Sequence, residues 1–398
     1  MQKKTIKDIE VKGKRVLVRV DFNVPLDADT NAISDDSRIK ASLPTIKYLV
    51  EHKAKIILCS HLGRPEGKVV DKLRMAPIAQ RLSQLIGLPV ITVSECVGKT
   101  VASKVKSLRD GDILFLENVR FYPEEEANDS DFAKALAGLA EIYVDDAFGT
   151  AHRAHASNVG VAKYLPSVAG FLVEKELEIM GNLLRDPKHP FACLVGGAKV
   201  RDKIGLLQNM LRKVDTLLVA GGMAATFLRA QGYEVGRSSV EEDKFGLAQE
   251  LLQEAKKWKI PFLLPIDVVV AKEIKGESET KTVVTSGVPP DSYIVDIGPR
   301  TIELFCHELE KCRSIMWNGP VGIYEIPEFA QGTKSLANLI STLSAKTVIG
   351  GGYTSEVVQE MVFTENMSHV STGGGASLRF LEGVSLPGVE VLQDKESL

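Results

Sequence analysis

The sequence predicts an α/β protein made of two doubly wound units, each built around a parallel sheet. Short runs rich in valine, isoleucine and leucine alternate with helical patterns along the whole chain. Such runs are typical of strands buried on both faces, and the helices between them are typical of parallel crossovers. The length of 398 residues exceeds the usual size of one domain and favours two.

The first half of the chain supplies five strand candidates separated by helical stretches. The strands are expected at residues 15–20, 56–60, 90–93, 113–117 and 142–146. Residues 42–52 and 75–87 carry apolar side chains at helical spacing and are expected to form helices between strands. This half therefore predicts one complete doubly wound unit.

The second half repeats the pattern. Its strands are expected at residues 191–195, 216–220, 261–265, 314–317, 347–349 and 369–372, with a helix over 241–258. A further helix is expected over 170–184, and the two prolines within 185–190 end it. The two units are expected to join in this region.

Charge and cysteine content exclude several classes of protein. The net charge of −3 gives no general attraction to nucleic acid or anionic membrane. The first 16 residues have no apolar core of a signal peptide, and no apolar run reaches the ~18 residues of a membrane span. Five scattered cysteines without a CxxC pair favour neither disulfides nor a zinc site, and they indicate a reducing cytoplasm.

Glycine turns follow four strands of the second half, in "LVGGAKV", "VAGGMAATF", "VIGGGYT" and "STGGGASL". Ligands of open parallel sheets bind at the carboxyl ends of strands, where bare backbone N–H groups can approach a phosphate. A single glycine turn is weak evidence, because tight strand-to-helix turns use glycine anyway. Four turns predict a phosphate-binding site, although none matches the Walker or the dinucleotide pattern.

Lys199 and Lys203 follow the first glycine turn. Because they are four residues apart, they are expected on one face of a helix, close to its N-terminus. Lysine opposes the helix dipole there, which favours a bound anion beside the pair. The alternative is a solvated pair next to Asp202.

Basic and polar residues of the first half recur at or shortly after strand ends. They are Arg19, Asp21, Asn23, His61, Arg64, Arg120, His152, Arg153 and His155, with Arg38 at the start of a helical stretch. Guanidinium groups suit carboxylates and phosphates. Each arginine alone is more often a surface or salt-bridge residue, but the recurrence predicts one basic pocket. No carboxylate or thiol stands at ligand spacing from the histidines, so no protein metal site is expected.

Eight segments resemble, in order, the motifs of the phosphoglycerate kinase family. They are "RVLVRVDFNVPLD", "SHLGRP", "LENVRF", "GTAHRAHAS", "GGAKVRDKI", "GGMAATFL", "MWNGPVGIYE" and "STGGGASLRFLEG". The resemblance implies two Rossmann-like domains facing across a hinged cleft. It also implies reversible phosphoryl transfer from 1,3-bisphosphoglycerate to MgADP, giving 3-phosphoglycerate and MgATP, in glycolysis and gluconeogenesis.

The same resemblance implies the domain limits and the partners. Residues 1–169 would bind the phosphoglycerate, 170–185 would form an interdomain helix, 186–375 would bind the nucleotide, and 376–398 would cross back to the N-terminal domain. The protein would be a cytoplasmic monomer that binds neither nucleic acid nor membrane, with Mg²⁺ carried by ADP or ATP.

By similarity to the family, two sets of residues would hold the ligands. The phosphoglycerate set is Asp21, Asn23, Arg38, His61, Leu62, Gly63, Arg64, Arg120 and Arg153. The nucleotide set is Lys199, Lys203, Gly298, Asn318, Glu325, Gly350, Gly351, Gly352, Tyr353 and Thr354.

The residues fit such a reaction. The acceptor is a carboxylate that is already ionised at neutral pH, so no general base is needed. Catalysis then requires alignment and neutralisation of charge on the transferring group. Arg38 would act from one side, and Lys203 with the N–H groups of Gly373, Gly374 and Gly375 from the other.

Tyr353 departs from the family pattern, which commonly has an aspartate there that helps to hold Mg²⁺. A neutral phenol is a poor magnesium ligand, so a water or the Thr354 hydroxyl would have to replace it. Two other hypotheses remain: a binding protein that has lost efficient transfer, for which only Tyr353 argues, and a nicotinamide-dependent dehydrogenase. The missing G-x-G-x-x-G pattern argues against the dehydrogenase.

Overall fold

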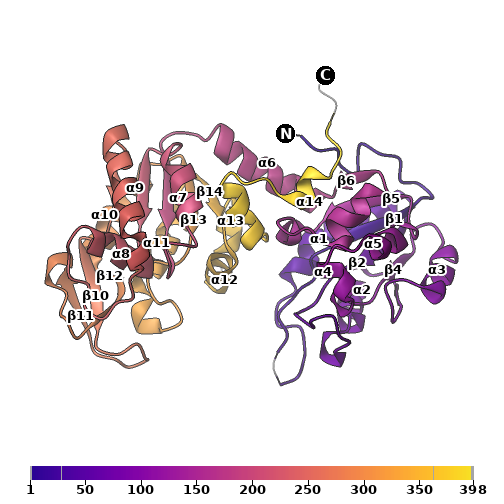
Figure 1. Ribbon diagram of the computed structural model, residues 1–398, viewed down its shortest axis with the longest axis horizontal. Coiled ribbons are helices and arrows are strands. Elements are labelled where there is room, and N and C mark those ends of the chain that lie inside the picture. The colour runs from indigo at the N-terminus through magenta and orange to yellow at the C-terminus, as the bar shows by residue number, and fades with distance from the viewer. Residues whose placement is uncertain (1, 28, 362, 396–398) are drawn as a thin grey trace. The chain divides into compact units, whose positions relative to one another are not determined.

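The computed structural model describes residues 2–27, 29–361 and 363–395, and the chain forms two compact units (Figure 1). Unit 1 contains the residues up to Glu178 together with those from Ser385 onward, and unit 2 contains Ile179–Val384. The boundary falls inside helix α6 (Phe171–Arg185), which confirms a helix where the sequence predicts one. Among the described residues, no helix combines the length and apolar character needed to span a membrane.

Within the described residues, unit 1 contains a six-stranded sheet in the order β3-β4-β2-β1-β5-β6, with every pair parallel. The strands are β1 (Arg15–Val20), β2 (Lys55–Cys59), β3 (Val90–Thr92), β4 (Ile113–Phe115), β5 (Ile142–Asp146) and β6 (Ser167–Ala169). The chain builds outward from β1 on one side and then returns to β5 on the other. The switch point therefore lies between β1 and β5, and ligands of such sheets bind outside the carboxyl ends of the strands there.

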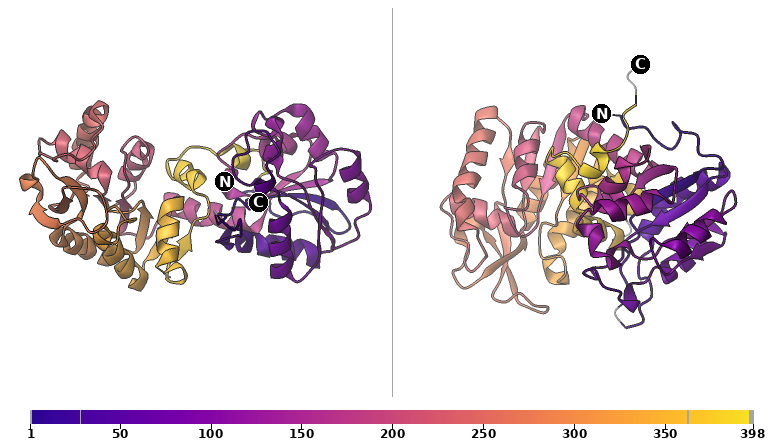
Figure 2. Two further views of the ribbon diagram at one scale, coloured as in Figure 1. Left: turned by 90° about the horizontal axis from the view of Figure 1, so that it is seen from below. Right: turned by 45° about the vertical axis from the view of Figure 1, so that its right-hand side comes forward.

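Helices lie against both faces of this sheet (Figure 2). They are α1 (Ser37–Glu51), α2 (Ala76–Ile86), α3 (Lys99–Lys106), α4 (Pro123–Glu126), α5 (Ser130–Ala137) and α14 (Pro387–Glu390). Val16, Val18, Ile56 and Val144 are fully buried in the core between them. Burial on both faces explains why the strands are continuous apolar runs rather than alternating ones.

The described part of unit 2 contains a second six-stranded parallel sheet, in the order β15-β14-β13-β7-β8-β9. The strands are β7 (Phe191–Val195), β8 (Thr216–Val219), β9 (Phe262–Leu263), β13 (Ser314–Asn318), β14 (Lys346–Ile349) and β15 (His369–Val370). Numbered within the unit, this is the doubly wound order 3-2-1-4-5-6, with its switch point between β7 and β13. The two predicted parallel sheets are confirmed.

The helices in the described part of unit 2 are α7 (Ile204–Leu211), α8 (Gly222–Ala230), α9 (Phe245–Trp258), α10 (Pro299–Glu310), α11 (Gln331–Thr342), α12 (Gly352–Glu360) and α13 (Gly375–Leu381). Of these, α8, α12 and α13 begin at glycine turns that the sequence shows. Strand β14, the turn at Gly350 and Gly351, and α12 form the expected strand, glycine turn and helix.

An antiparallel three-stranded sheet in the described part of unit 2 was not predicted. It consists of β10 (Asp267–Ala271), β11 (Thr280–Val284) and β12 (Tyr293–Ile297). In the sequence, acidic residues interrupt the apolar runs that would mark these strands. Asp267 is nevertheless buried, and its carboxylate accepts the N–H groups of Arg300 and Thr301 at the start of α10. A helix N-terminus thus stabilises a charge that the apolar pattern excludes.

The C-terminal segment belongs to unit 1. The buried Lys3 ammonium donates to the Leu392 carbonyl at 2.9 Å and pairs with Asp394 at 2.8 Å. The Lys4 N–H donates to the Gln393 carbonyl at 2.7 Å. Helix α13 lies in unit 2, so the chain returns to unit 1 after Val384 rather than after residue 375.

We expect the stability of the protein to depend on pH because a buried carboxyl group, that of Asp146, contacts the start of α6. The fully buried Asp146 accepts the Leu172 N–H at 2.9 Å, and burial raises the pKa of its carboxyl to about 7. Between about pH 4 and 7 the folded state therefore holds a proton that the unfolded state has released, so the free energy of unfolding falls as pH rises. Asp146→Asn keeps a side-chain oxygen that can accept the Leu172 N–H. This variant is expected to have a melting temperature that changes less with pH over this range and that is higher than that of the wild type near pH 7.

Thermal melts followed by circular dichroism from pH 5 to 8 check this expectation. Asp131→Asn is the matched control, because Asp131 is exposed on α5. An Asp146→Asn protein with the same pH slope as the control would contradict the assignment.

Candidate functional site

The basic cluster of unit 1 lies at the carboxyl ends of its strands. Asp21 and Asn23 follow β1, His61 follows β2, and Arg120 lies in a 3₁₀ turn (Val119–Phe121) after β4. Arg153 comes after β5, beyond a short turn (Phe148–Thr150). The recurrence at strand ends seen in the sequence is thus a shared edge of one sheet.

The guanidinium group of Arg38 is held by Asp21. Arg38 is the second residue of α1, and its Nη1 donates to the Asp21 Oδ2 at 2.5 Å. The Asp21 side chain is 9% exposed, whereas the Arg38 side chain is 32% exposed. One terminal nitrogen of the guanidinium group is therefore fixed by a buried carboxylate, while the side chain remains partly exposed.

His61 is buried, and its tautomer follows from its partner. Its Nδ1 lies 3.1 Å from the Nη2 of Arg19. A guanidinium group only donates, so the Nδ1 accepts and the proton of the neutral ring lies on Nε2. Burial lowers the pKa of His61 well below its usual value, with further lowering by Arg19, Arg120, Arg38 and Arg153. The neutral ring is thus a hydrogen-bond donor at Nε2.

Arg19 is itself fixed by a buried network that sequence reasoning did not find. Its Nε donates to the Ser157 Oγ at 2.9 Å, and that hydroxyl donates to Glu125 at 2.6 Å. Glu125 and Ser157 are fully buried, and Arg19 is 2% exposed. Arg19 therefore does not face solvent, and it holds the neighbouring His61 ring in place.

The loop after β2 is shaped by side chains from two other strand ends. Asn23 accepts the Gly63 N–H at 2.8 Å, and Arg120 donates to the Gly63 carbonyl at 2.8 Å. Asn118, fully buried and absent from the predicted set, donates to the Leu62 carbonyl at 2.8 Å. Arg64, at the end of this loop, is exposed.

The guanidinium groups of this cluster repel one another. Burial lowers the pKa of Arg120, with further lowering by Arg153 and Arg19, although Glu126 and Glu125 act in the opposite direction. Converging cations of this kind are relieved by a bound anion, and forked donors suit carboxylate and phosphate oxygens. The geometry therefore fits a small molecule with both groups.

The glycine turns of unit 2 differ in what surrounds them. A Cβ added to Gly196 would lie 2.1 Å from the Pro320 carbonyl, and one on Gly319 would lie 2.3 Å from the Gly196 carbonyl. These glycines are required because neighbouring turns pack backbone to backbone. A Cβ on Gly352 or Gly374 would meet no described atom within 4 Å, so these two positions face open space, whereas a Cβ on Gly351 would lie 2.8 Å from the Asn318 Nδ2.

Lys203 faces the ends of β7 and β13. Its ammonium donates to the Oδ1 of the fully buried Asn318, whose Nδ2 donates to the Gly350 carbonyl at 2.7 Å. Burial lowers the pKa of Lys203. The prediction that Lys199 and Lys203 share a helix face is wrong, because α7 begins only at Ile204 and Lys199 lies in an exposed loop.

Gly298 of the nucleotide set and Gly373 of the last glycine turn have internal contacts. A Cβ on Gly298 would lie 2.3 Å from the Asp267 carboxyl carbon, so close packing alone requires glycine there. The Gly373 N–H donates to the Ser371 Oγ at 3.1 Å, which leaves Gly374 and Gly375 to offer N–H groups at that turn.

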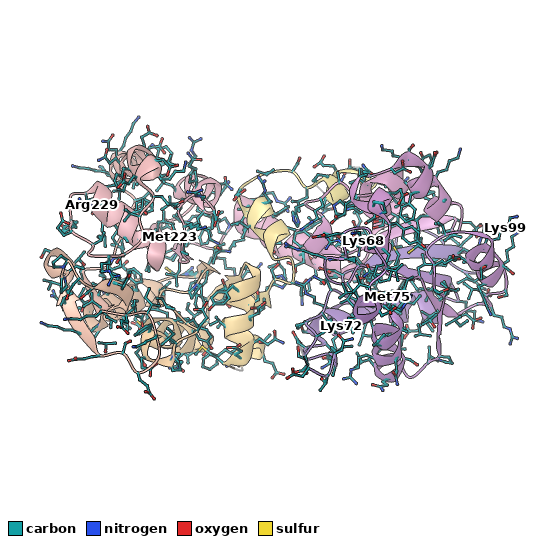
Figure 3. All side chains as sticks on the ribbon, turned by 60° about the horizontal axis from the view of Figure 1, so that its bottom comes forward. Lys68, Lys72, Met75, Lys99, Met223 and Arg229 are labelled. Carbon is teal, nitrogen blue, oxygen red and sulfur yellow. The ribbon has the colours of Figure 1, made fainter. Side chains whose placement is uncertain are left out.

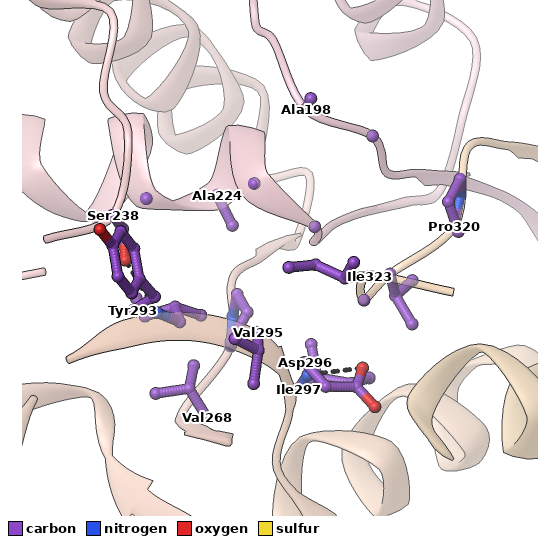
Figure 4. A pocket seen from close by; sticks show the side chains of 18 of the residues that line it. Ala198, Ala224, Ser238, Val268, Tyr293, Val295, Asp296, Ile297, Pro320 and Ile323 are labelled. Atoms are coloured by element: carbon purple, nitrogen blue, oxygen red, sulfur yellow. Dashed lines mark hydrogen bonds between the residues drawn. The ribbon is translucent and has the colours of Figure 1, made fainter. Parts of the chain in front are cut away.

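A cavity of about 460 Å³ next to the glycine turns was not predicted (Figure 4). Ala224 and Leu228 of α8, Val268 of β10, Val295 of β12 and Ile323 are among its lining residues. Helix α8 buries Met223 and exposes Arg229, which pairs with Glu234 (Figure 3). Apolar pocket residues cannot be told from core residues in a sequence, which explains why they were missed.

Tyr353 and Glu325 lie together at this cavity. Both residues are among those that line it. Burial raises the pKa of Tyr353, with further raising by Glu325, so the phenol is neutral. Thr354 is 2% exposed and accepts the Gly319 N–H at 2.7 Å. Its hydroxyl therefore does not face a ligand.

The described residues contain no group of three or more histidine, cysteine or acidic side chains that could hold a metal ion. The neutral phenol of Tyr353 and the buried hydroxyl of Thr354 do not fit a direct magnesium ligand either. A metal ion at the glycine turns would have to be held mainly by its ligand's own oxygens.

Comparison with known proteins agrees with this arrangement. The sequence model of the family described as phosphoglycerate kinase matches residues 6–384. The chain is 55% identical to phosphoglycerate kinase of Dictyoglomus turgidum, over 99% of this chain and 100% of that protein. It is 53% identical to phosphoglycerate kinase of Pelotomaculum thermopropionicum, with the same coverage.

A solved structure of phosphoglycerate kinase from Coxiella burnetii superposes with a TM-score of 0.87 at 39% identity and covers 98% of both chains. The likeness therefore extends through both units and both sheets. The family match over residues 6–384 and the full-length relatives show that the chain belongs to the phosphoglycerate kinase family.

Proposed function

We propose that unit 1 holds the phosphoglycerate at its basic cluster and that unit 2 holds the nucleotide at its glycine turns and apolar cavity. As a member of its family, the chain is a kinase of glycolysis that uses ADP and ATP. It transfers a phosphoryl group reversibly from 1,3-bisphosphoglycerate to ADP, giving 3-phosphoglycerate and ATP. The observation that carries the assignment is the convergence of arginines around a neutral His61.

In unit 1, two kinds of hydrogen-bond donor contact the two anionic ends of the ligand. Arg38, Arg64, Arg120 and Arg153 supply guanidinium forks, and the Nε2–H of His61 adds a neutral donor. Arg120 is pre-oriented by its bond to the Gly63 carbonyl. Because Arg38, Arg120 and His61 are held by contacts within unit 1 before the ligand arrives, these three lose little side-chain entropy on binding.

In unit 2, the apolar cavity accepts the base, and its volume of about 460 Å³ is ample for one. The phosphates extend toward Lys203 and the turns at Gly350–Gly352 and Gly373–Gly375, in which Gly352 and Gly374 face open space. Mg²⁺ would enter with the nucleotide, whose own phosphate oxygens would supply most of its ligands, and it would neutralise part of the phosphate charge.

The reaction itself needs charge neutralisation rather than proton transfer. The acceptor carboxylate is ionised at neutral pH, so no base is required. Arg38 and Lys203 neutralise the transferring group, with the N–H groups of Gly374 and Gly375. Each pocket uses residues of one chain only, which supports a monomer, and a kinase of glycolysis is proposed to act in the cytoplasm; light scattering at assay concentration tests the monomer.

Paired variants test the division of ligands. Arg64→Ala removes an exposed guanidinium group of unit 1, and Ala224→Leu fills the apolar cavity of unit 2. Titration calorimetry is expected to show 3-phosphoglycerate binding about tenfold weaker in the first variant and ADP binding about tenfold weaker in the second. Each variant is expected to bind the other ligand as the wild type does. A variant that weakens only the wrong ligand would overturn the assignment.

A further inference from the structure

We propose that Glu125 is a positioning residue that keeps the His61 ring in one tautomer, with its proton on Nε2. Glu125, which lies on α4, acts through Ser157 of a short helical turn (Ala156–Gly160) and then through Arg19 of β1. The inference rests on the proposed phosphoglycerate site of unit 1. It adds to that site a set of buried side chains that set the donor state of a ligand-binding residue.

The network begins at a carboxylate, which only accepts hydrogen bonds. The Glu125 Oε1 accepts the Ser157 hydroxyl at 2.6 Å, and its Oε2 accepts the Ser157 N–H at 2.8 Å. The His155 Nδ1 lies 3.7 Å from the same Oε1. Burial would raise the pKa of the Glu125 carboxyl, but His155, Arg19 and Ser157 lower it below its usual value. The ionised carboxylate therefore fixes where the only hydroxyl proton of the serine points.

The network continues through a guanidinium group, which only donates. Because the Ser157 proton is used on Glu125, the serine Oγ accepts from the Arg19 Nε at 2.9 Å. The Nη2 of the same guanidinium group lies 3.1 Å from the His61 Nδ1. Each bond in the network can therefore run in one direction only, and the Nδ1 at its end is an acceptor.

A second neighbour of the His61 Nδ1 favours the opposite tautomer. The Asp21 Oδ1 lies 3.9 Å from this nitrogen, and a carboxylate can only accept a proton from it. If Arg19 were released, the neutral ring would take its proton on Nδ1, directed at Asp21. The Nε2 would then lose the hydrogen that a phosphate or carboxylate oxygen accepts. The tautomer of His61 thus depends on how firmly Arg19 is held.

Burial makes this network depend on its own members. Arg19 is 2% exposed, and Glu125 and Ser157 are fully buried. A buried charge is costly unless it is paired and hydrogen-bonded, so loss of one member forces the others to rearrange. The backbone of Arg19 is fixed because β1 pairs with β2 on one side and β5 on the other. Only the side chain of Arg19 can respond, and its movement changes what the His61 Nδ1 meets.

The test replaces the carboxylate by a side chain of the same shape, in Glu125→Gln. The amide oxygen can keep the bond from the Ser157 N–H, and the amide N–H group then donates to the Ser157 Oγ. The serine proton is thereby turned toward the Arg19 Nε, which is also a donor, and the bond between them is lost.

Nitrogen-15 NMR of protein labelled at histidine shows which ring nitrogen carries the proton, with the His61 signals assigned by their loss in His61→Ala. The wild type is expected to show a protonated Nε2 and an unprotonated Nδ1. In Glu125→Gln, the proton is expected to move wholly or partly to Nδ1.

Titration calorimetry measures the consequence for the ligands. Glu125→Gln is expected to bind 3-phosphoglycerate about five- to tenfold more weakly, which corresponds to the loss of one neutral hydrogen bond. ADP binding is expected to be unchanged. With both ligands saturating, kcat is expected to stay within about threefold of the wild type, because the change affects binding of the phosphoglycerate rather than charge on the transferring group.

Two further variants separate positioning from general damage. Ser157→Ala breaks the network at its next member and is expected to cause the same proton shift and the same loss of affinity. In the Ser157→Ala background, Glu125→Gln is expected to have little further effect. Glu124→Gln, at an exposed position on the same helix, is the matched control and is expected to leave the His61 signals and both affinities unchanged.

A His61 ring that keeps its proton on Nε2 in Ser157→Ala, or in a folded Glu125→Gln, would overturn the inference, even if 3-phosphoglycerate bound more weakly. A His61→Ala protein that binds 3-phosphoglycerate as tightly as the wild type would instead contradict the proposed site of unit 1. The NMR result does not depend on any ligand, so the two failures are distinguishable.

Discussion

Replacing Arg38 with alanine is expected to lower kcat about a thousandfold or more while the fold is kept. Arginines that contact a transferring phosphoryl group contribute factors of this size. Asp21 fixes one terminal nitrogen of the Arg38 guanidinium group, and the side chain remains partly exposed, so it can contact a ligand without reorganising. Steady-state kinetics, with circular dichroism to verify folding, measures the loss.

Two further variants sharpen this test. Arg38→Lys is expected to restore little activity, because an ammonium group lacks the fork that contacts Asp21 and a phosphate together. Arg15→Ala is the matched control, because Arg15 also pairs with a carboxylate, Glu141, and is similarly exposed at 34%. It starts β1, whereas the cluster lies at the other end of that strand. An Arg38→Ala protein that keeps more than a tenth of wild-type kcat would rule out the assigned role.

Lys203→Met is expected to lower kcat at least about a hundredfold. Methionine keeps much of the side-chain length but removes the charge that neutralises the transferring group. The loss should appear in kcat more than in the affinity for 3-phosphoglycerate, because Lys203 belongs to unit 2. Lys256→Met, at an exposed position on α9, is the control and is expected to be neutral.

Single-turnover kinetics with saturating ligands isolates the chemical step from binding. Should Lys203→Met stay within tenfold of the wild type in this step, charge neutralisation from unit 2 must come from another group. The N–H groups of Gly374 and Gly375 would then be the remaining candidates.

The two parallel sheets were predictable because strands buried on both faces leave continuous apolar runs in the sequence. The basic cluster was predictable for a related reason. Asp21, His61 and Arg120 each follow a different strand, and the carboxyl ends of parallel strands share one edge of the sheet. Position relative to a strand thus places side chains that are far apart in sequence.

Other features depend on tertiary contacts that leave no pattern in the sequence. Asp267 reads as a break in an apolar run, but the N-terminus of α10 stabilises its buried charge. Lys199 was expected on a helix because spacing alone does not show that the turn after β7 extends to Lys203. Tyr353 and Glu325 line the same cavity because α12 lies beside the segment after β13, which only the folded chain reveals.

The division of labour between the units is tested most directly by a crystal structure of the protein with MgADP and 3-phosphoglycerate. We expect 3-phosphoglycerate to contact Arg38, His61 and Arg120, with its carboxylate directed at the nucleotide's terminal phosphate. We expect the adenine to lie in the apolar cavity beside Ala224, with the phosphates at Lys203. Electron density for either ligand in the other unit, or for ADP outside the cavity, would contradict it.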